Sequence, residues 1–285
     1  MQAFLELLKA VLFGIVEGIT EWLPVSSTGH IILLDEFIKL TVYSDPEQNK
    51  TFMEMFNVVI QLGAILAVIV LFFHKLNPFS PKKDAIAKKN TWTLWFKVVV
   101  AVLPSAVLGL LFDDWMDEHL YNYIVVAVTL ILYGVAFLFV ERLNKAHTVK
   151  FADVHTIDYK TAILIGAFQC LSLIPGTSRS GATILGAILL GVSRSAGAEF
   201  SFFLAIPTML GASALKMIDF LDEVRFTPLS IAVLITSCLV SFLVSLLVIK
   251  GLMEYVRKRS FAAFGVYRIV LGVLVVGYFV IKTVI

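Results

Sequence analysis

The chain has 285 residues, of which 59% are hydrophobic and 15% are charged, and its mean hydropathy is +0.91. Soluble domains carry about a quarter of their residues as Asp, Glu, Lys and Arg, so this composition indicates a polytopic membrane protein. The net charge of +2 and the lack of a dense basic segment exclude a nucleic-acid partner. Cys170 and Cys238 lie far apart in apolar sequence, which predicts two small buried side chains and neither a disulfide framework nor a metal site.

Six apolar runs are long enough to cross a hydrocarbon core, which takes about 20 helical residues. They are residues 52–74, 92–112, 120–140, 198–217, 228–249 and 262–284. Four other apolar pieces are too short to cross or hold glutamates at their inner end, namely 1–22, 30–40, 161–174 and 181–192. Taken in pairs, they predict two helix–loop–helix hairpins, 1–40 and 161–192, that enter the membrane halfway and return. Irregular backbone at that depth survives only where protein or a wet cavity satisfies it, so a site is expected there.

The loops of these hairpins are two polar islands, residues 17–30 (EGITEWLPVSSTGH) and 175–183 (PGTSRSGAT). Charged side chains at membrane depth are costly and usually mark a functional site. The islands also align with each other at an offset of 152 residues, which pairs Gly14, Thr20, Ser26, Thr28 and Gly29 with Gly166, Ser172, Ser178, Ser180 and Gly181. The alignment predicts one site built from two repeats.

Loop charge predicts the orientation, because lysine and arginine accumulate on the cytoplasmic side. The basic loops 75–91, 141–160 and 250–260 are expected inside, and the loops 113–119 and 218–227 are expected outside with both termini. Each half, 1–150 and 151–285, then holds one re-entrant hairpin and three spans in opposite orientations. Such an inverted-topology repeat predicts a site near the midplane, and it also leaves open a transporter or flippase of a phosphorylated lipid.

Both loops lead directly into a helix, so each offers free N–H groups and a partial positive charge to an anion such as phosphate. Gly29 and Gly181 allow close approach of the backbone to a ligand. Six hydroxyl groups surround these positions, from Ser26, Ser27, Thr28, Thr177, Ser178 and Ser180. For any one serine, helix capping is the ordinary role, but the cluster beside an arginine predicts a binding site.

The charged residues suggest phosphoryl chemistry. Arg179 offers a planar fork that fits phosphate oxygens, and its alternative role is an ion pair with Glu17 or Glu21. The two glutamates are four residues apart on one helix face, so they repel unless a proton, a cation or Arg179 intervenes. His30 follows Ser27 by three residues and could act as its base or as a nucleophile itself.

At these residues the chain closely resembles the undecaprenyl-diphosphate phosphatase family, the bacitracin-resistance membrane phosphatases of bacteria. Both islands match the family's motifs, and matching segments, such as 60–64, 191–194 and 199–207, extend over nearly the whole chain. The one departure in the first motif is Trp22, where the family commonly has phenylalanine, and it puts no site residue in doubt. The resemblance implies an all-helical membrane hydrolase that converts the C55 polyprenyl diphosphate to its monophosphate and inorganic phosphate on the outer face of the bacterial cytoplasmic membrane. This reaction recycles the lipid carrier for peptidoglycan synthesis.

The resemblance also implies roles for individual residues. The catalytic set is expected to be Ser27, His30, Glu21 and Arg179. Ser27 is expected to attack the terminal phosphorus, either His30 or Glu21 to manage its proton, and Arg179 to stabilise the transferring phosphoryl group. Substrate contacts are expected from Ser26, Thr28, Gly29, Ser178, Ser180 and Thr183. A divalent cation, Mg²⁺ or Ca²⁺, is expected on Glu17 and Glu21, and the prenyl chain is expected in an apolar groove between the halves. The partners are thus the polyprenyl diphosphate lipid and the bilayer, and a homodimer is left open.

Overall fold

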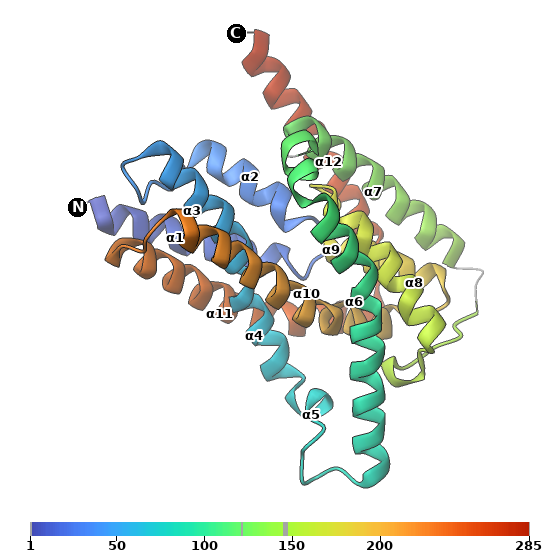
Figure 1. Ribbon diagram of the computed structural model, residues 1–285. Coiled ribbons are helices and arrows are strands. Elements are labelled where there is room, and N and C mark those ends of the chain that lie inside the picture. Colours follow the sequence, from blue (N-terminus) through green and yellow to red (C-terminus); the bar gives the residue numbers. More distant parts are fainter. Residues whose placement is uncertain (1, 121, 145–147, 285) are drawn as a thin grey trace.

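The computed structural model describes residues 2–120, 122–144 and 148–284, and within these ranges the regular structure is helical apart from one parallel bridge between Phe151 and Val192. The prediction of an all-α membrane protein is therefore confirmed (Figure 1). The elements in chain order are α1 (Gln2–Thr20), α2 (Ser27–Phe37), α3 (Pro46–Val59), α4 (Gln61–Leu71), α5 (Phe73–Leu76), α6 (Ala85–Leu120), α7 (Tyr123–Asn144), the 3-10 helix η1 (Val154–Thr156), α8 (Tyr159–Cys170), the 3-10 helix η2 (Leu171–Leu173), α9 (Arg179–Leu189), α10 (Arg194–Glu223), α11 (Pro228–Lys258) and α12 (Ala262–Val284).

Six helical segments of the described chain are long and apolar enough to cross a membrane, as predicted. They are Pro46–Leu71, Ala85–Phe112, Tyr123–Asn144, Arg194–Glu223, Pro228–Lys258 and Ala262–Lys282. The first of these consists of α3 and α4, which are separated at Ile60. Ile60 keeps helical angles, φ −58° and ψ −28°, so Asn57 and Gln61 lie one turn apart on the same face, and the Gln61 side-chain amide donates back to the Asn57 carbonyl at 3.4 Å.

The short apolar pieces form two helix–loop–helix units, α1 with α2 and α8 with α9. The second arms begin at Ser27 and Arg179, positions that the 152-residue offset pairs. These arms start two or three residues before the apolar runs 30–40 and 181–192, because the polar loop residues already cap and enter the helix. That the hairpins turn inside the membrane stays a prediction.

Three loops expected from their charge are largely helical instead. The acidic segment 113–119 continues α6 to Leu120, residues 218–223 of the segment 218–227 continue α10 to Glu223, and most of the basic segment 250–260 continues α11 to Lys258. None of these continuations contains a proline, which would stop a helix, so each helix extends past its apolar run. The prediction of loops in these segments was therefore wrong.

Helix packing crosses between the two halves of the chain. The first arm α1 packs along α11, and the corresponding arm α8 packs along α6, while α7 and α12 lie side by side (Figure 1). Close backbone approach requires glycine at both crossings, because a methyl group on Gly14 would lie 2.7 Å from the Ser237 carbonyl oxygen and one on Gly166 would overlap the Ala101 backbone. The crossed packing brings the two hairpin loops together.

Candidate active site

The two hairpin loops meet at one place. We define the first loop as residues 21–26, between α1 and α2, and the second loop as residues 174–178, between η2 and α9. The Ser180 hydroxyl, which is fully buried, donates to the backbone carbonyls of Glu21 and Leu23 at 3.1 and 3.3 Å. Trp22 anchors the first loop on α10 through an edge-on contact with Phe202, whose ring centroid is 5.1 Å away. The site predicted from two repeats is thus one contiguous cluster.

Each loop enters its second helix through a strained serine. Ser26 and Ser178 have φ angles of 74° and 71°, and they are the non-glycine residues with positive φ in the described part of the chain. Each hydroxyl accepts the N–H of the glycine three residues on, Gly29 at 3.2 Å and Gly181 at 3.1 Å. A side chain in this region of φ costs about 1–3 kcal/mol, and such strain concentrates at functional sites. The N-cap roles considered for both serines are present in the structure.

A chain of hydrogen bonds joins Ser27, Glu21 and Arg179. The Ser27 hydroxyl donates to Glu21 Oε2 at 2.6 Å, and Arg179 Nη2 donates to Glu21 Oε1 at 3.0 Å. The Arg179 guanidinium also donates through Nη1 to the Ser201 carbonyl at 2.8 Å and lies over the Trp22 ring. The Glu21 and Arg179 side chains are only 5% and 9% exposed, so each buried charge is balanced by the other and not by solvent. This arrangement holds a carboxylate against the serine hydroxyl.

His30 is held by other partners. Its Nδ1 lies 2.7 Å from the Ser26 carbonyl, which can only accept, so this nitrogen carries the proton. In the neutral ring the other nitrogen, Nε2, then accepts from the Tyr267 hydroxyl at 2.7 Å, and the two rings are stacked. Of the two candidate bases, the structure therefore places Glu21, and not His30, at the Ser27 hydroxyl.

The other predicted contact residues fall into two groups. Thr183 is buried behind Arg179, where its hydroxyl donates to the Arg179 carbonyl at 2.8 Å and contacts Ser201 Oγ at 2.6 Å. With Ser180, it supports the loops. Ser26 and Ser178 are the N-cap residues of α2 and α9, where an anion would approach, and Gly29 donates its N–H to the Ser26 hydroxyl. Substrate contact by each residue of the predicted set stays a prediction.

Glu17 and Thr28 line a small cavity of about 80 Å³ beside this cluster. Glu17 is 1% exposed, and its Oε1 has no hydrogen-bond partner. Asn57, in α3, also lines the cavity, and its Oδ1 is likewise buried without a partner. Within the described residues, no group of three or more His, Cys, Asp and Glu side chains is placed to hold a metal ion.

Arg268, in the second turn of α12, is a site residue that the sequence did not bring to notice. It is fully buried and donates to one carbonyl of each loop, Pro24 at 3.2 Å and Gly176 at 2.8 Å. Its guanidinium also lies over the Tyr133 ring, with the centroid 5.5 Å away. A signal was available, because this arginine lies within the predicted span 262–284 and a charge at membrane depth is costly.

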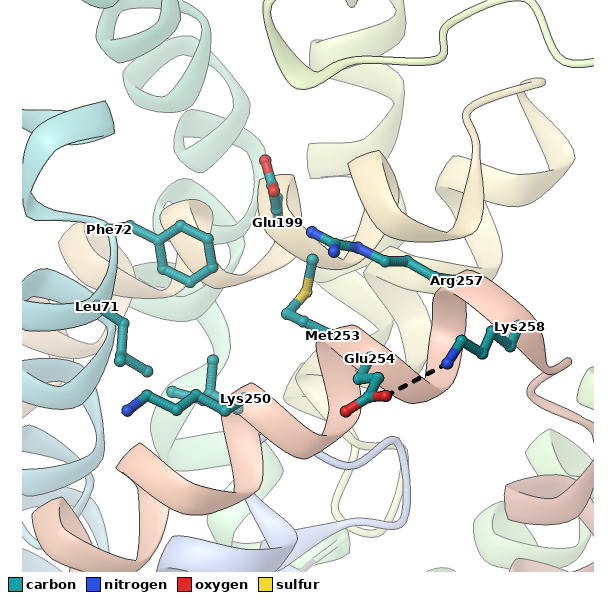
Figure 2. A pocket seen from close by; sticks show the side chains of 9 residues that line it. Leu71, Phe72, Glu199, Lys250, Met253, Glu254, Arg257 and Lys258 are labelled. Carbon is teal, nitrogen blue, oxygen red and sulfur yellow. Dashed lines mark hydrogen bonds and ion pairs between the residues drawn. The ribbon is translucent and has the colours of Figure 1, made fainter.

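A larger hollow of about 540 Å³ lies away from these residues, between the end of α4, α10 and the last turns of α11 (Figure 2). Its walls carry Leu71, Phe72, Glu199, Ile249, Lys250, Met253, Glu254, Arg257 and Lys258. Glu254 and Lys258 pair across one helix turn at 3.3 Å, and Glu199 pairs with Lys75. No residue of either hairpin loop lines this hollow, so it does not belong to the candidate active site.

The fold and the site define a polytopic helical membrane protein with a buried Ser–Glu–Arg cluster assembled from two hairpin loops. The model of the family described as bacitracin resistance protein BacA matches residues 10–274, and the chain belongs to this family.

Relatives of this chain are named undecaprenyl-diphosphatase. The relative from Lactiplantibacillus plantarum is 59% identical over 96% of this chain and 98% of its own length. The relative from Enterococcus faecalis is 57% identical over the same shares. The relative from Streptococcus thermophilus is 55% identical over 99% of this chain and 96% of its own length. The similarity therefore extends over nearly the whole of each protein.

Proposed function

We propose that the protein is a membrane phosphatase that hydrolyses undecaprenyl diphosphate to undecaprenyl phosphate and inorganic phosphate. Relatives named for this activity match nearly the full chain at 55–59% identity. The observation that carries the proposal is the contact of the Ser27 hydroxyl with Glu21, whose second oxygen holds Arg179. A serine, a carboxylate and a guanidinium in contact are what phosphoryl transfer to a side chain requires.

In the first step Ser27 Oγ attacks the terminal phosphorus and a new O–P bond forms. Glu21 accepts the serine proton through Oε2, which already receives that hydrogen bond at 2.6 Å. The bond between the terminal phosphorus and the bridging oxygen breaks, and its electron pair leaves with undecaprenyl phosphate. Glu21 then passes the proton to the departing phosphate oxygen and is again a carboxylate.

In the second step a water molecule attacks the phosphoserine. Glu21 takes a proton from this water, and the Ser27–phosphorus bond breaks with its electron pair on the serine oxygen. The same proton returns to that oxygen, and inorganic phosphate leaves. Glu21 therefore acts in each step first as the general base that accepts a proton and then as the general acid that returns it.

Arg179 is suited to the charge that develops on the transferring phosphoryl group. Its Nε is buried without a partner, so one N–H remains to be satisfied. The starts of α2 and α9 add the partial positive charges of two helix N-termini at the same place. Donors fixed in advance around a phosphoryl group provide the electrostatic stabilisation on which this chemistry depends.

A divalent cation, Mg²⁺ or Ca²⁺, is part of the proposal. The residues present fit a hard cation at Glu17, because its Oε1 is buried and unpartnered and oxygen ligands suit both ions. They fit less well at Glu21, since Ser27 and Arg179 already engage its two oxygens. When bound, the cation would supply positive charge to neutralise the diphosphate.

The setting proposed for this chemistry is the bacterial cytoplasmic membrane, with the site near the midplane and open to the outer side. The halves 1–150 and 151–285 would form inverted repeats, and the crossed packing of α1 on α11 and α8 on α6 supports this arrangement. The prenyl chain would lie in the bilayer-facing groove between them.

The test is phosphate release from undecaprenyl diphosphate by purified protein in liposomes, measured beside lipid translocation across the same bilayer. The wild type is expected to release phosphate, and Ser27→Ala is expected to abolish release. Ser44→Ala, in an exposed loop, is the matched control. Translocation without phosphate release by the wild type would overturn the proposal in favour of a flippase.

A further inference from the structure

Among the described residues, Glu17 forms no ion pair, and its Oε1 has no hydrogen-bond partner. Glu21 forms an ion pair with Arg179 at 3.0 Å. Arg268 donates through Nη1 to the Pro24 carbonyl and through Nη2 to the Gly176 carbonyl. A buried carboxylate with an unpartnered oxygen is strongly unfavourable, so Glu17 requires a proton or a cation.

The cavity beside Glu17 offers further oxygen atoms. Asn57 Oδ1 is buried there without a donor, and Thr28 and Gln61 also line the space. Gln61 directs its NH₂ group to the Asn57 backbone carbonyl, so the group it offers to a ligand is its side-chain oxygen. About 80 Å³ exceeds the roughly 10–15 Å³ needed for one water, so the cavity has room for a hydrated cation.

Helix geometry explains why these groups face one another. Ile60 keeps helical angles, φ −58° and ψ −28°, and its N–H donates to the Phe56 carbonyl at 3.0 Å. Asn57 and Gln61 are four residues apart, so both side chains lie on one helix face and line the same cavity. Two unpartnered acceptors and a hydroxyl around a space that contains no cationic side chain favour a cation over an anion.

We propose that Glu17, Asn57, Gln61 and Thr28 form a site for a hard divalent cation, Mg²⁺ or Ca²⁺, and that Glu21 is not one of its ligands. One carboxylate with neutral oxygens binds such an ion weakly, and substrate phosphates then supply the remaining charge. The role of the ion in catalysis rests on the proposed diphosphate hydrolysis. The binding of the ion does not rest on that reaction, because the oxygen atoms of the site are in place without substrate.

The test measures binding of Mn²⁺, an oxygen-liganded divalent probe, to the purified full-length protein by electron paramagnetic resonance, with and without methylenediphosphonate. Asn57→Asp adds a second carboxylate to the cavity and is expected to tighten Mn²⁺ binding about ten-fold or more. Asn57→Leu and Glu17→Gln are expected to weaken binding by about ten-fold or more. Asn90→Asp adds the same charge at an exposed position of α6 and is expected to change nothing.

A gain of affinity in Asn57→Asp cannot come from misfolding, which keeps the test sharp if Asn57→Leu is unstable. Glu21→Gln is expected to bind Mn²⁺ within about two-fold of the wild type, since the ion does not touch it. The proposal is overturned if Asn57→Asp binds no more tightly than Asn90→Asp, if Glu21→Gln abolishes binding, or if the wild type binds no Mn²⁺ with methylenediphosphonate present. Because no turnover is measured, failure of the phosphatase assay alone would leave this result intact.

Discussion

The Ser27 hydroxyl lies 2.6 Å from Glu21 Oε2, and this contact joins the first residue of α2 to the residue just after α1. The two ends of the first loop are therefore linked by a hydrogen bond between the proposed nucleophile, Ser27, and its proposed base, Glu21. Arg179 reaches the same carboxylate from the other half of the chain at 3.0 Å. The site depends on both hairpins, since one supplies the serine and the carboxylate and the other supplies the guanidinium.

The first prediction concerns His30, whose ring nitrogens form hydrogen bonds with Ser26 and Tyr267 and not with Ser27. His30→Gln removes the hydrogen bonds to Ser26 and Tyr267 and is expected to lower kcat by less than about 100-fold, because loss of a general base costs about 10²–10⁴-fold. Tyr267→Phe, which removes only the outer bond, is expected to have a smaller effect. The measurement is phosphate release at saturating substrate, and trapping of a phosphohistidine would reverse the roles of His30 and Ser27.

The second prediction concerns Arg179. Arg179→Lys keeps the charge but cannot hold the Ser201 carbonyl and Glu21 with one rigid fork, so kcat is expected to fall much more than KM rises. Steady-state kinetics measure this split. An unchanged kcat with a raised KM would mean that Arg179 contacts only the ground state.

The third prediction concerns Arg268, which ties the two loops together. Arg268→Ala leaves the Pro24 and Gly176 carbonyls unsatisfied, at about 1–3 kcal/mol for each group, so both thermal stability and kcat are expected to fall. Added guanidinium should restore part of kcat by refilling the space between the loops. Arg257→Ala, at the distant hollow of Figure 2, is the control for losing an arginine. Lost stability with full kcat would show that Arg268 supports the fold and does not position the loops.

The fourth prediction concerns orientation. A cysteine at Glu118, near the exposed end of α6, should react with a membrane-impermeant maleimide added outside intact cells. A cysteine at Lys88, at the other end of the same helix, should react only after the cells are opened. The opposite pattern would overturn the assignment of the basic segments to the cytoplasm.

Much of this architecture could be predicted from the sequence because membrane spans follow from the length of apolar runs. The two loops were found for a related reason, since polar residues at that depth are rare enough to stand out. The start of α9 at Arg179 agrees with the 152-residue alignment that pairs it with Ser27. Local pattern was sufficient for these features.

Contacts made across the fold could not be predicted in the same way. The conformation of the loop at Ser26 decides whether Glu21 or His30 contacts the Ser27 hydroxyl. The positive φ of Ser26 cannot be predicted from its residue type, since serine rarely adopts it. The sequence places Asn57 and Gln61 one helix turn apart, but their position beside Glu17 depends on the packing of α4 against α1. Arg268 was overlooked because it lies alone in an apolar helix outside both polar islands.

The central claim is that the Ser27–Glu21 pair performs the hydrolysis, and Glu21→Gln tests it most directly. The substitution keeps the size of the side chain but removes the base, so phosphate release from undecaprenyl diphosphate in liposomes should fall by about 10²–10⁴-fold. Protein level and thermal unfolding verify that the variant is folded. Release by Glu21→Gln at the wild-type rate would contradict the account.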